Sequence, residues 1–576
     1  MFYSIKNLFN IFDNINFRIP FSLIFFIIFN SFVEVIGFGL LIPIIGIIAD
    51  ENFYQQFMIF IHQINFIDIS FLFNLTKINF INLFILFTLI VFFLKFIINL
   101  YFNFYVYELK KKIELKLSQS LLESISKSEN FFYLENATSK LVNNITSRCT
   151  GVTTALVNII YFFSELIVFL IISSVISVLY IYEAITIAFI LTSIFGIYYL
   201  TYKNLIANWS KLRALSGDKR INSLINFFQG IRELIIYSKF EYLKKEFSKN
   251  NEIFLNQMKK INLLNIIPKI TLELFFVTLI LSVIIFQVNR NFNNENLLFS
   301  LSLFVVVLIR MMPSINRMIF NFNQFKYSNE NIITLNKFLM SSLSKVSSNE
   351  TISFKNSIEL KRINFSYNKE KTIFENLNFK IEKNKKIGLV GEVGLGKSTL
   401  LDLIAGFLLP QSGKIFADEK NIAEFNINNW LKNICFISQK SFIFENSIRH
   451  NITFSNDDQK IDEIKFKDVI KKFKLEDLIN QNPEKEFFNL GENGKNISGG
   501  QRQKIALARA LYSTRDFFIL DEATNAMDEK NELEIINELL RLKNKTIIFV
   551  THKKNNLINF DEIFKISSST INKLSL

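Results

Sequence analysis

The chain has 576 residues, 50% of them hydrophobic, and a mean hydropathy of +0.27, which argues against a soluble enzyme and favours several domains. Its net charge of +14 could indicate nucleic-acid binding, but long apolar segments favour a membrane protein with basic cytoplasmic loops and no nucleic-acid partner. Cys149 and Cys435 lie far apart without His or Cys neighbours, which excludes a metal-ligand spacing and a disulfide framework.

Long apolar segments are concentrated before residue 320. A helix needs about 20 apolar residues to cross a bilayer. Six segments reach that length, namely 20–49, 78–106, 152–180, 184–202, 266–288 and 297–320. They predict a six-span α-helical membrane domain over residues 1–320, and buried helices of a soluble protein are the competing interpretation. The first segment is expected to remain as an anchor, because no signal-peptide cleavage pattern follows a short apolar region.

Basic residues are concentrated in two of the segments between the spans, 108–150 and 203–265. The segment 50–77 instead carries three acidic residues against one lysine. Because Lys and Arg mark cytoplasmic loops, we expect both basic segments and both termini in the cytoplasm. The two basic segments are long and have a helical pattern, so we also expect the spans to continue as helices beyond the membrane. Helices that merely present a solvated face are the alternative.

The basic residues inside the spans include Lys95, Lys269 and Arg310. A charge at bilayer depth is costly, so it usually faces a partner or an aqueous cavity. One interpretation is a cationic lining that binds an anionic headgroup. The alternatives are snorkelling to the interface or pairing with the acids of the spans, Glu34, Glu165 and Glu273.

A hydrophilic linker over 321–356 is expected to lead into a soluble α/β domain over 357–576. In that domain a buried strand at 386–390 precedes Gly391-Glu392-Val393-Gly394-Leu395-Gly396-Lys397-Ser398, which matches G-x-x-x-x-G-K-[ST], and a helix follows from Thr399. Glycines let backbone N–H groups surround a phosphate, and the helix points its positive end at the same anion. Lys397 would reach the β- and γ-phosphates and Ser398 would hold Mg²⁺.

Two further strand ends carry groups suited to phosphoryl transfer. The apolar strand from Phe517 ends in Asp521, which fits a Mg²⁺ ligand, and Glu522, which fits the base that polarises the attacking water. His552 follows the apolar strand 546–550 and is interpreted as a γ-phosphate contact, with a structural histidine as the alternative. Together with the P-loop, these residues predict an ATPase that uses Mg²⁺.

The segment Ile497-Ser498-Gly499-Gly500-Gln501 resembles the LSGGQ signature of the ATP-binding cassette (ABC) transporter family, with Ile for the usual Leu. Six spans before one cassette resemble the exporter class, so the resemblance covers the whole chain. It implies that Tyr367 stacks on adenine, that Gln439 contacts Mg²⁺ and the membrane domain, and that His552 is the switch histidine. Departures such as Val393 for Ser and Lys553 for Arg remove no catalytic group.

The resemblance also implies a complete set of site residues. Those expected to be catalytic are Glu522, His552 and Gln439, and the expected metal ligands are Ser398, Gln439 and Asp521. The nucleotide is expected to contact Tyr367, Gly391, Glu392, Val393, Gly394, Leu395, Gly396, Lys397, Ser398, Thr399, Ser498, Gly499, Gly500, Gln501 and Asp528. In this family the signature of one subunit completes the site of the other, so one cassette per chain implies a dimer, and the intact groups favour a homodimer.

The stretch Arg310-Met311-Met312-Pro313-Ser314-Ile315-Asn316-Arg317 resembles the sixth span of bacterial flippases for lipid-linked oligosaccharides. This implies an ATP-driven flippase for an anionic lipid-linked sugar, in the bacterial inner membrane and in contact with its lipids. An exporter of lipid A-type lipids, peptides or drugs is an alternative. An ATP-gated channel or regulator is another, although the intact Glu522 argues against it.

Overall fold

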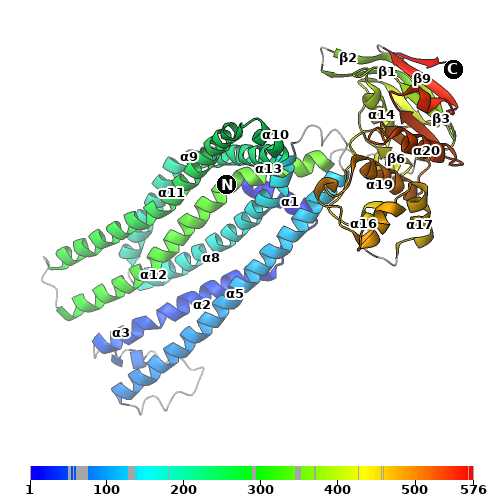
Figure 1. The fold of residues 1–576 in the computed structure, drawn as a ribbon. Coiled ribbons are helices and arrows are strands. Elements are labelled where there is room, and N and C mark those ends of the chain that lie inside the picture. Colours follow the sequence, from blue (N-terminus) through cyan, green and yellow to red (C-terminus); the bar gives the residue numbers. More distant parts are fainter. Residues whose placement is uncertain are drawn as a thin grey trace. The chain divides into compact units, whose positions relative to one another are not determined.

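The computed structural model describes residues 2–49, 54–55, 57–59, 76–127, 137–179, 181–288, 294–343, 352–368, 371–425, 427–455, 457, 460–567 and 570–574. The chain divides into two compact units, which we describe separately. The helical unit comprises Met1–Ser126 and Asn136–Leu343, and the α/β unit comprises Lys127–Glu135 and Ser344–Leu576. Figure 1 shows the long helices of the first and the sheets of the second.

The helical unit is built from α1 (Phe2–Asn14), α2 (Ser22–Gly39), α3 (Leu41–Ala49), α5 (Lys77–Lys127), α7 (Thr138–Asn143), the π-helix η2 (Asn144–Arg148), α8 (Cys149–Leu179), α9 (Ile181–Gln229), α10 (Ile231–Ile236), α11 (Phe240–Val288), α12 (Asn294–Tyr327) and α13 (Asn329–Leu343). Within the described residues, three stretches are long and apolar enough to cross a bilayer, Lys77–Ser126, Thr138–Ser174 and Phe240–Thr278. Each expected span falls on a helix, and the first is divided at Leu40 between α2 and α3.

The long helices continue well past the expected ends of the spans. Helix α5 runs on to Lys127, α9 runs on to Gln229, and α11 already begins at Phe240. Helix α8 packs against α12 and α2, while α9 packs along α11. Between α8 and α12, Arg317 Nε donates to Glu165 Oε1 at 2.5 Å, so Glu165 is paired with the last residue of the sixth-span stretch 310–317.

The structure corrects the expected linker over 321–356. Helix α12 extends to Tyr327, and α13 belongs to the helical unit, where it packs against α1 and α8. Ile332, Leu335 and Leu339 of α13 are buried, at the three- to four-residue spacing of one helix face. Asn336 Nδ2 also donates to Asn7 Oδ1 of α1 at 3.2 Å. Polar residues between these positions make the segment hydrophilic on average, although one face is apolar.

The α/β unit contains β1 (Ser357–Asn368), β2 (Lys371–Glu382), β3 (Lys386–Val390), α14 (Lys397–Ala405), β4 (Ser412–Ala417), β5 (Lys420–Asn421), η3 (Ile422–Glu424), α15 (Ile427–Leu431), β6 (Ile434–Ile437), α16 (Ile448–Thr453), α17 (Glu463–Lys472), α18 (Glu476–Asn480), η5 (Lys485–Phe487), η6 (Glu492–Gly494), α19 (Gly499–Tyr512), β7 (Phe517–Asp521), α20 (Glu529–Leu540), β8 (Thr546–Val550), η7 (Lys554–Leu557), β9 (Glu562–Ser567) and β10 (Thr570–Leu574). Its strands form an antiparallel sheet, in the order β2-β1-β4-β5, and a six-stranded sheet, in the order β10-β9-β3-β8-β7-β6.

The central strands β3, β8 and β7 position the candidate site. They are parallel, and all their residues are buried, as expected for strands covered on both faces. Leu389 pairs with Val550, and Asp521 pairs with the same residue. The loops after β3, β7 and β8 therefore begin side by side at the carboxyl edge of the sheet, where ligands bind in open α/β sheets.

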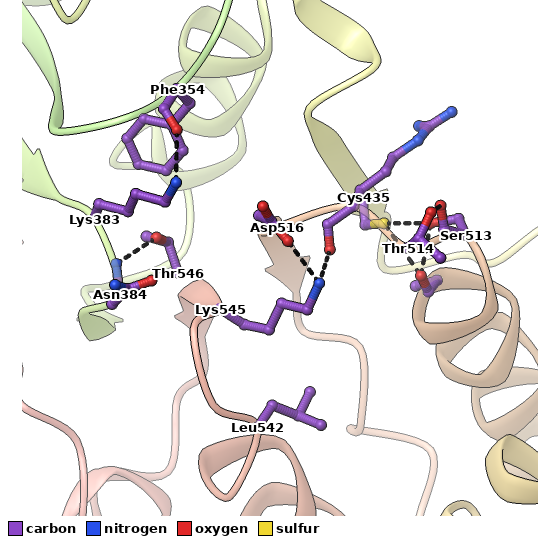
Figure 2. Close-up of polar contacts among 12 residues, drawn as sticks. Phe354, Lys383, Asn384, Cys435, Ser513, Thr514, Asp516, Leu542, Lys545 and Thr546 are labelled. Atoms are coloured by element: carbon purple, nitrogen blue, oxygen red, sulfur yellow. Dashed lines mark hydrogen bonds and ion pairs between the residues drawn. The ribbon is translucent and has the colours of Figure 1, made fainter. Parts of the chain in front are cut away.

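The amino edge of the same sheet carries structural contacts (Figure 2). Lys545 Nζ donates to Asp516 Oδ1 at 2.7 Å, and the two residues precede neighbouring strands β8 and β7. Cys435 Sγ lies 2.9 Å from Ser513 Oγ, and burial raises the pKa of this thiol. A thiol that is buried and kept protonated is not a reactive nucleophile. This end of the sheet therefore supports the fold, and the chemistry lies at the opposite end.

Candidate nucleotide site

The loop between β3 and α14 is shaped to surround a phosphate. Gly394 and Gly396 adopt φ angles of +85° and +89°, in the left-handed region that glycine enters without a Cβ penalty. Lys397 begins α14, and its Nζ donates to the carbonyl oxygens of Gly391 and Glu392, both at 2.8 Å. Burial lowers the pKa of Lys397, while Glu522 and Asp521 act in the opposite direction. The loop thus holds a cation at a helix N-terminus, which fits a phosphate.

Ser398 and Asp521 form the oxygen pair expected to hold a metal ion. Ser398 Oγ donates to Asp521 Oδ2 at 2.7 Å. Burial raises the pKa of Asp521, and the hydrogen bond from Ser398 lowers it. The described residues contain no cluster of three or more His, Cys, Asp or Glu side chains that could hold a metal. One hydroxyl and one carboxylate fit Mg²⁺, because this ion is usually held by few protein ligands together with substrate phosphates.

The carboxylate of Glu522 is held by three side chains. His552 Nε2 lies 2.8 Å from Oε1, while Gln439 Nε2 and Asn525 Nδ2 donate to Oε2 at 2.8 Å and 2.7 Å. Glu522 also has a φ of +50°, an uncommon backbone conformation for a residue with a Cβ, and such strain clusters at functional sites. The structure thus brings together the three residues expected to be catalytic, and it adds Asn525, which the sequence analysis missed.

The signature segment lies against the loop that follows Glu522. Ser498 caps α19 through a capping box, in which Ser498 Oγ accepts from Gln501 N and Gln501 Oε1 accepts from Ser498 N. A Cβ added to Gly500 would lie 3.2 Å from the carbonyl oxygen of Ala526, a tight contact with backbone that glycine avoids. One turn into α19, the buried Gln503 donates to Glu522 O at 3.4 Å and accepts from Ala526 N at 3.0 Å. Gln503 was not among the residues expected from the sequence.

The other expected nucleotide contacts lie around this core. Tyr367, near the end of β1, is 57% exposed, and its Oη lies 3.2 Å from Thr399 Oγ1 on the P-loop helix. An exposed ring beside that helix fits the expected stacking on adenine. Val393 is 86% exposed at the tip of the loop. Asp528 caps α20, and hydrogen bonds from Asn531 lower the pKa of Asp528.

We expect Asp402→Asn to stabilise the nucleotide-free protein. Burial, together with the charge of Asp521, raises the pKa of Asp402 from 3.8 to about 6. The folded protein therefore binds this proton more tightly than the unfolded chain, so ionised Asp402 destabilises the fold above about pH 6 and has no effect below about pH 4. For a half-exposed side chain we expect a gain of about 1 kcal/mol at pH 7.5 that disappears near pH 4. Unfolding followed across this pH range tests it, and a gain independent of pH would contradict it.

The residues expected to bind a transported substrate lie on three different helices. Lys95 of α5 packs beside α2, where a Cβ added to Gly37 would lie 3.0 Å from Lys95 Cδ. Lys269 is exposed on α11, and the side chain of Arg310 on α12 lies outside the described residues. The substrate role of these three residues therefore remains a prediction.

Comparisons with known proteins agree with this geometry. Residues 374–525 match the family model described as ABC transporter. The heterocyst differentiation ATP-binding protein HepA of Nostoc sp. is 31% identical over 347 residues, which cover 59% of this chain and 56% of that protein. An ATP-dependent lipid A-core flippase of Saccharophagus degradans is 34% identical over 38% of this chain and 37% of its own length. The chain thus spans 56% of the length of the first of these curated relatives and 37% of the length of the second.

The structure of a bacterial Atm1-family ABC exporter with ATP bound is similar to the fold of the whole chain. The TM-score is 0.77 and the match covers 94% of each chain, at 15% sequence identity. At this identity the likeness concerns the fold alone, whereas the cassette also matches in sequence. The P-loop, the signature and the matched model identify residues 374–525 as an ABC transporter domain, and the whole chain has the fold of an ABC exporter half-transporter.

Proposed function

We propose that the chain is one subunit of an ATP-hydrolysing exporter that moves an amphipathic, anionic lipid-linked sugar across the bacterial inner membrane. The observation that carries its ATPase part is the hydrogen-bonded set of side chains gathered at the carboxyl ends of β3, β7 and β8. In this proposal Lys397 binds the phosphates, and Ser398 and Asp521 bind Mg²⁺. Glu522 accepts the proton of the attacking water. Relatives named lipid A-core flippases support a lipid-type substrate.

In this proposal the residues act mainly by positioning and by neutralising charge. Lys397 binds the β- and γ-phosphate oxygens, for which it exchanges its present carbonyl partners in the loop. Mg²⁺, when bound by Ser398 and Asp521, offsets the negative charge of the phosphates. Glu522 accepts a proton as water attacks the γ-phosphorus and the bond from that phosphorus to the β–γ bridging oxygen breaks. His552, which lies next to Glu522, would contact the γ-phosphate.

The transporter is proposed to be a homodimer with both termini and both cassettes in the cytoplasm. The capped N-terminus of α19 carries Ser498, Gly499 and Gly500, and the positive end of such a helix is suited to an anion. Each copy would present this end to the nucleotide held by the P-loop of its partner. Closure of the two cassettes on ATP would then be transmitted to the membrane helices, and hydrolysis would reset them.

Purified protein in lipid vesicles tests the proposal. We expect Mg²⁺-dependent ATP turnover, a dimer by cross-linking, and ATP-dependent appearance of a lipid-linked oligosaccharide on the opposite leaflet, read by a glycosidase that cannot enter the vesicle. Turnover stimulated instead by lipid A, a peptide or a drug would replace the substrate but keep the exporter. An ionic current gated by ATP without turnover would favour the channel. Protein that neither hydrolyses ATP nor self-associates would refute the proposal.

We expect Arg310→Ala to reduce substrate-stimulated ATPase by about tenfold, the effect of one charge-assisted contact to an anionic headgroup, while basal ATPase changes little. The measurement is phosphate release with and without lipid-linked oligosaccharide. Lys249→Ala is the control, because this exposed lysine lies on α11 outside the expected span and should leave both rates unchanged. Equal loss of basal and stimulated rates in Arg310→Ala would argue against a headgroup contact.

A further inference from the structure

Asn525 contacts the carboxylate expected to act as the base. Its Nδ2 donates to Glu522 Oε2 at 2.7 Å. An ionised carboxylate only accepts hydrogen bonds, so the side-chain amide must present its NH₂ group and not its oxygen to Glu522. Gln439 donates to the same oxygen at 2.8 Å, and His552 lies at the other one. Asn525 therefore makes one of three contacts that set the orientation of this carboxylate.

The turn that carries Asn525 is fixed from two sides. Gln503 of α19 spans it, since its amide oxygen accepts from Ala526 N at 3.0 Å and its NH₂ group donates to Glu522 O at 3.4 Å. Gln503 is itself buried. Within the turn, Asn525 N donates to Glu522 O at 3.3 Å. The backbone of Asn525 is thus held in place, and its side chain can reach Glu522 without ordering a free loop.

A second link connects the turn to the strand end that carries His552. The buried Glu532 of α20 accepts from Thr524 Oγ1 at 2.9 Å with one carboxylate oxygen and from Lys553 Nζ at 2.6 Å with the other. Thr524 precedes Asn525, and Lys553 follows His552. The chain neighbours of two groups that contact Glu522 are therefore bound to one buried carboxylate, which links the turn to the strand end.

The contact gains importance once nucleotide binds. By the family resemblance Gln439 is expected to turn to Mg²⁺, which would remove it from Glu522 Oε2. Asn525 would then be the donor left on that oxygen among the contacts described here. A carboxylate offers about four lone-pair positions, so the donors at both oxygens still leave room for the attacking water. The strained backbone of Glu522 makes such a restraint useful, because the residue would otherwise relax.

We propose that Asn525 is a positioning residue that holds the Glu522 carboxylate toward the attacking water during ATP hydrolysis. This inference rests on the proposed function, in which Glu522 is the base. It assigns a role to a side chain that acts through Glu522 and does not touch the nucleotide itself. It predicts changes in kcat without matching changes in the KM for ATP.

The test compares Asn525→Ala, Asn525→Asp and Asn525→Ser in the full chain. We expect Asn525→Ala to lower kcat about tenfold, within the range for misplacing a general base, with the KM for ATP within about twofold. Asn525→Asp should lower kcat about a hundredfold, because a second carboxylate repels Glu522. Asn525→Ser, which restores a shorter donor, should recover part of the loss. Thermal midpoints of all three should stay within a few degrees of the native value.

Asn421 provides a matched control. Its Nδ2 donates to Glu424 Oε1 at 2.9 Å, which is also an Asn-to-Glu bond between residues three apart, but it lies between β5 and η3. Asn421→Ala and Asn421→Asp should therefore leave kcat unchanged. Native kcat in Asn525→Asp would overturn the inference, and so would equal losses in Asn525→Ala and Asn525→Asp that follow a fall in the thermal midpoint.

Glu522→Gln, measured beside these variants, separates the role of Glu522 as the base from the role of Asn525 as a positioning residue. If Glu522→Gln still hydrolyses ATP, the proposed function of Glu522 fails and the role of Asn525 fails with it. If Glu522→Gln is inactive while Asn525→Asp turns over like the native protein, only the role of Asn525 fails.

Discussion

Glu522→Gln is expected to lower ATP turnover by about 1000-fold while ATP still binds, because a general base contributes roughly 100- to 10,000-fold and an amide cannot accept the proton. The substitution conserves shape. Two of the three groups that contact this side chain, Gln439 and Asn525, end in amides that can rotate and present their oxygens to the new NH₂ group. The loss should therefore reflect chemistry and not a collapse of the site.

The measurement is phosphate release at saturating Mg²⁺ and ATP, together with a binding titration that uses a fluorescent ATP analogue. Glu424→Gln is the control, since Glu424 also accepts a hydrogen bond from an asparagine but lies outside the site. We expect native turnover in the control and an affinity within about threefold of native in Glu522→Gln, since the base acts mainly in the transition state. Native turnover in Glu522→Gln would mean that another group, such as Asp521 or His552, is the base.

The core of the site could be predicted because its chemistry lies in short contiguous segments. Lys397 and Ser398 belong to one motif, and Asp521 and Glu522 end one buried strand. Parallel strands with matched register bring their carboxyl ends together, as the pairing of both Leu389 and Asp521 with Val550 shows. The contact between Ser398 and Asp521, 123 positions apart, follows from that arrangement.

The supporting side chains could not be predicted in the same way. Gln503 and Glu532 act through contacts between a helix and the turn after β7, and no residue pattern marks a buried amide or carboxylate as a bridge. The available signal for Asn525 was weak, a polar side chain three positions after an expected base in a turn. The only signal for Gln503 was its position, one turn into the helix that follows the signature. Such roles depend on the packing of α19 and α20 against the sheet.

The fold shows the same limit. Apolar residues on both sides of Leu40 conceal the break between α2 and α3, because hydropathy reports burial or membrane contact and not the continuity of a helix. The end of the helical unit was missed for the opposite reason, since the segment 321–356 is hydrophilic on average although its helix α13 buries Ile332 and Leu335. Both differences lie in how helices end and pack, which average composition does not record.

Gly396→Ala is expected to destabilise the α/β unit by about 2 to 4 kcal/mol and to abolish nucleotide binding. A left-handed backbone costs an L-residue roughly 1 to 2 kcal/mol, and a steric overlap adds to that cost. The φ of Gly396 is +89°, and an added Cβ would lie 2.6 Å from Ile373 Cγ2 and 3.1 Å from Phe374 Cζ, both on β2. Gly394→Ala is the matched variant.

Gly394 has a φ of +85°, but no atom lies within 4 Å of its added Cβ, so Gly394→Ala carries the backbone cost alone. Thermal unfolding of the nucleotide-free full chain should therefore place Gly396→Ala below Gly394→Ala, by the cost of the overlap with β2. Adding Ile373→Ala, which removes the closest atom, should return part of that difference. If both glycine variants unfold at the same temperature, β2 does not restrict the P-loop, and the strain lies in the backbone alone.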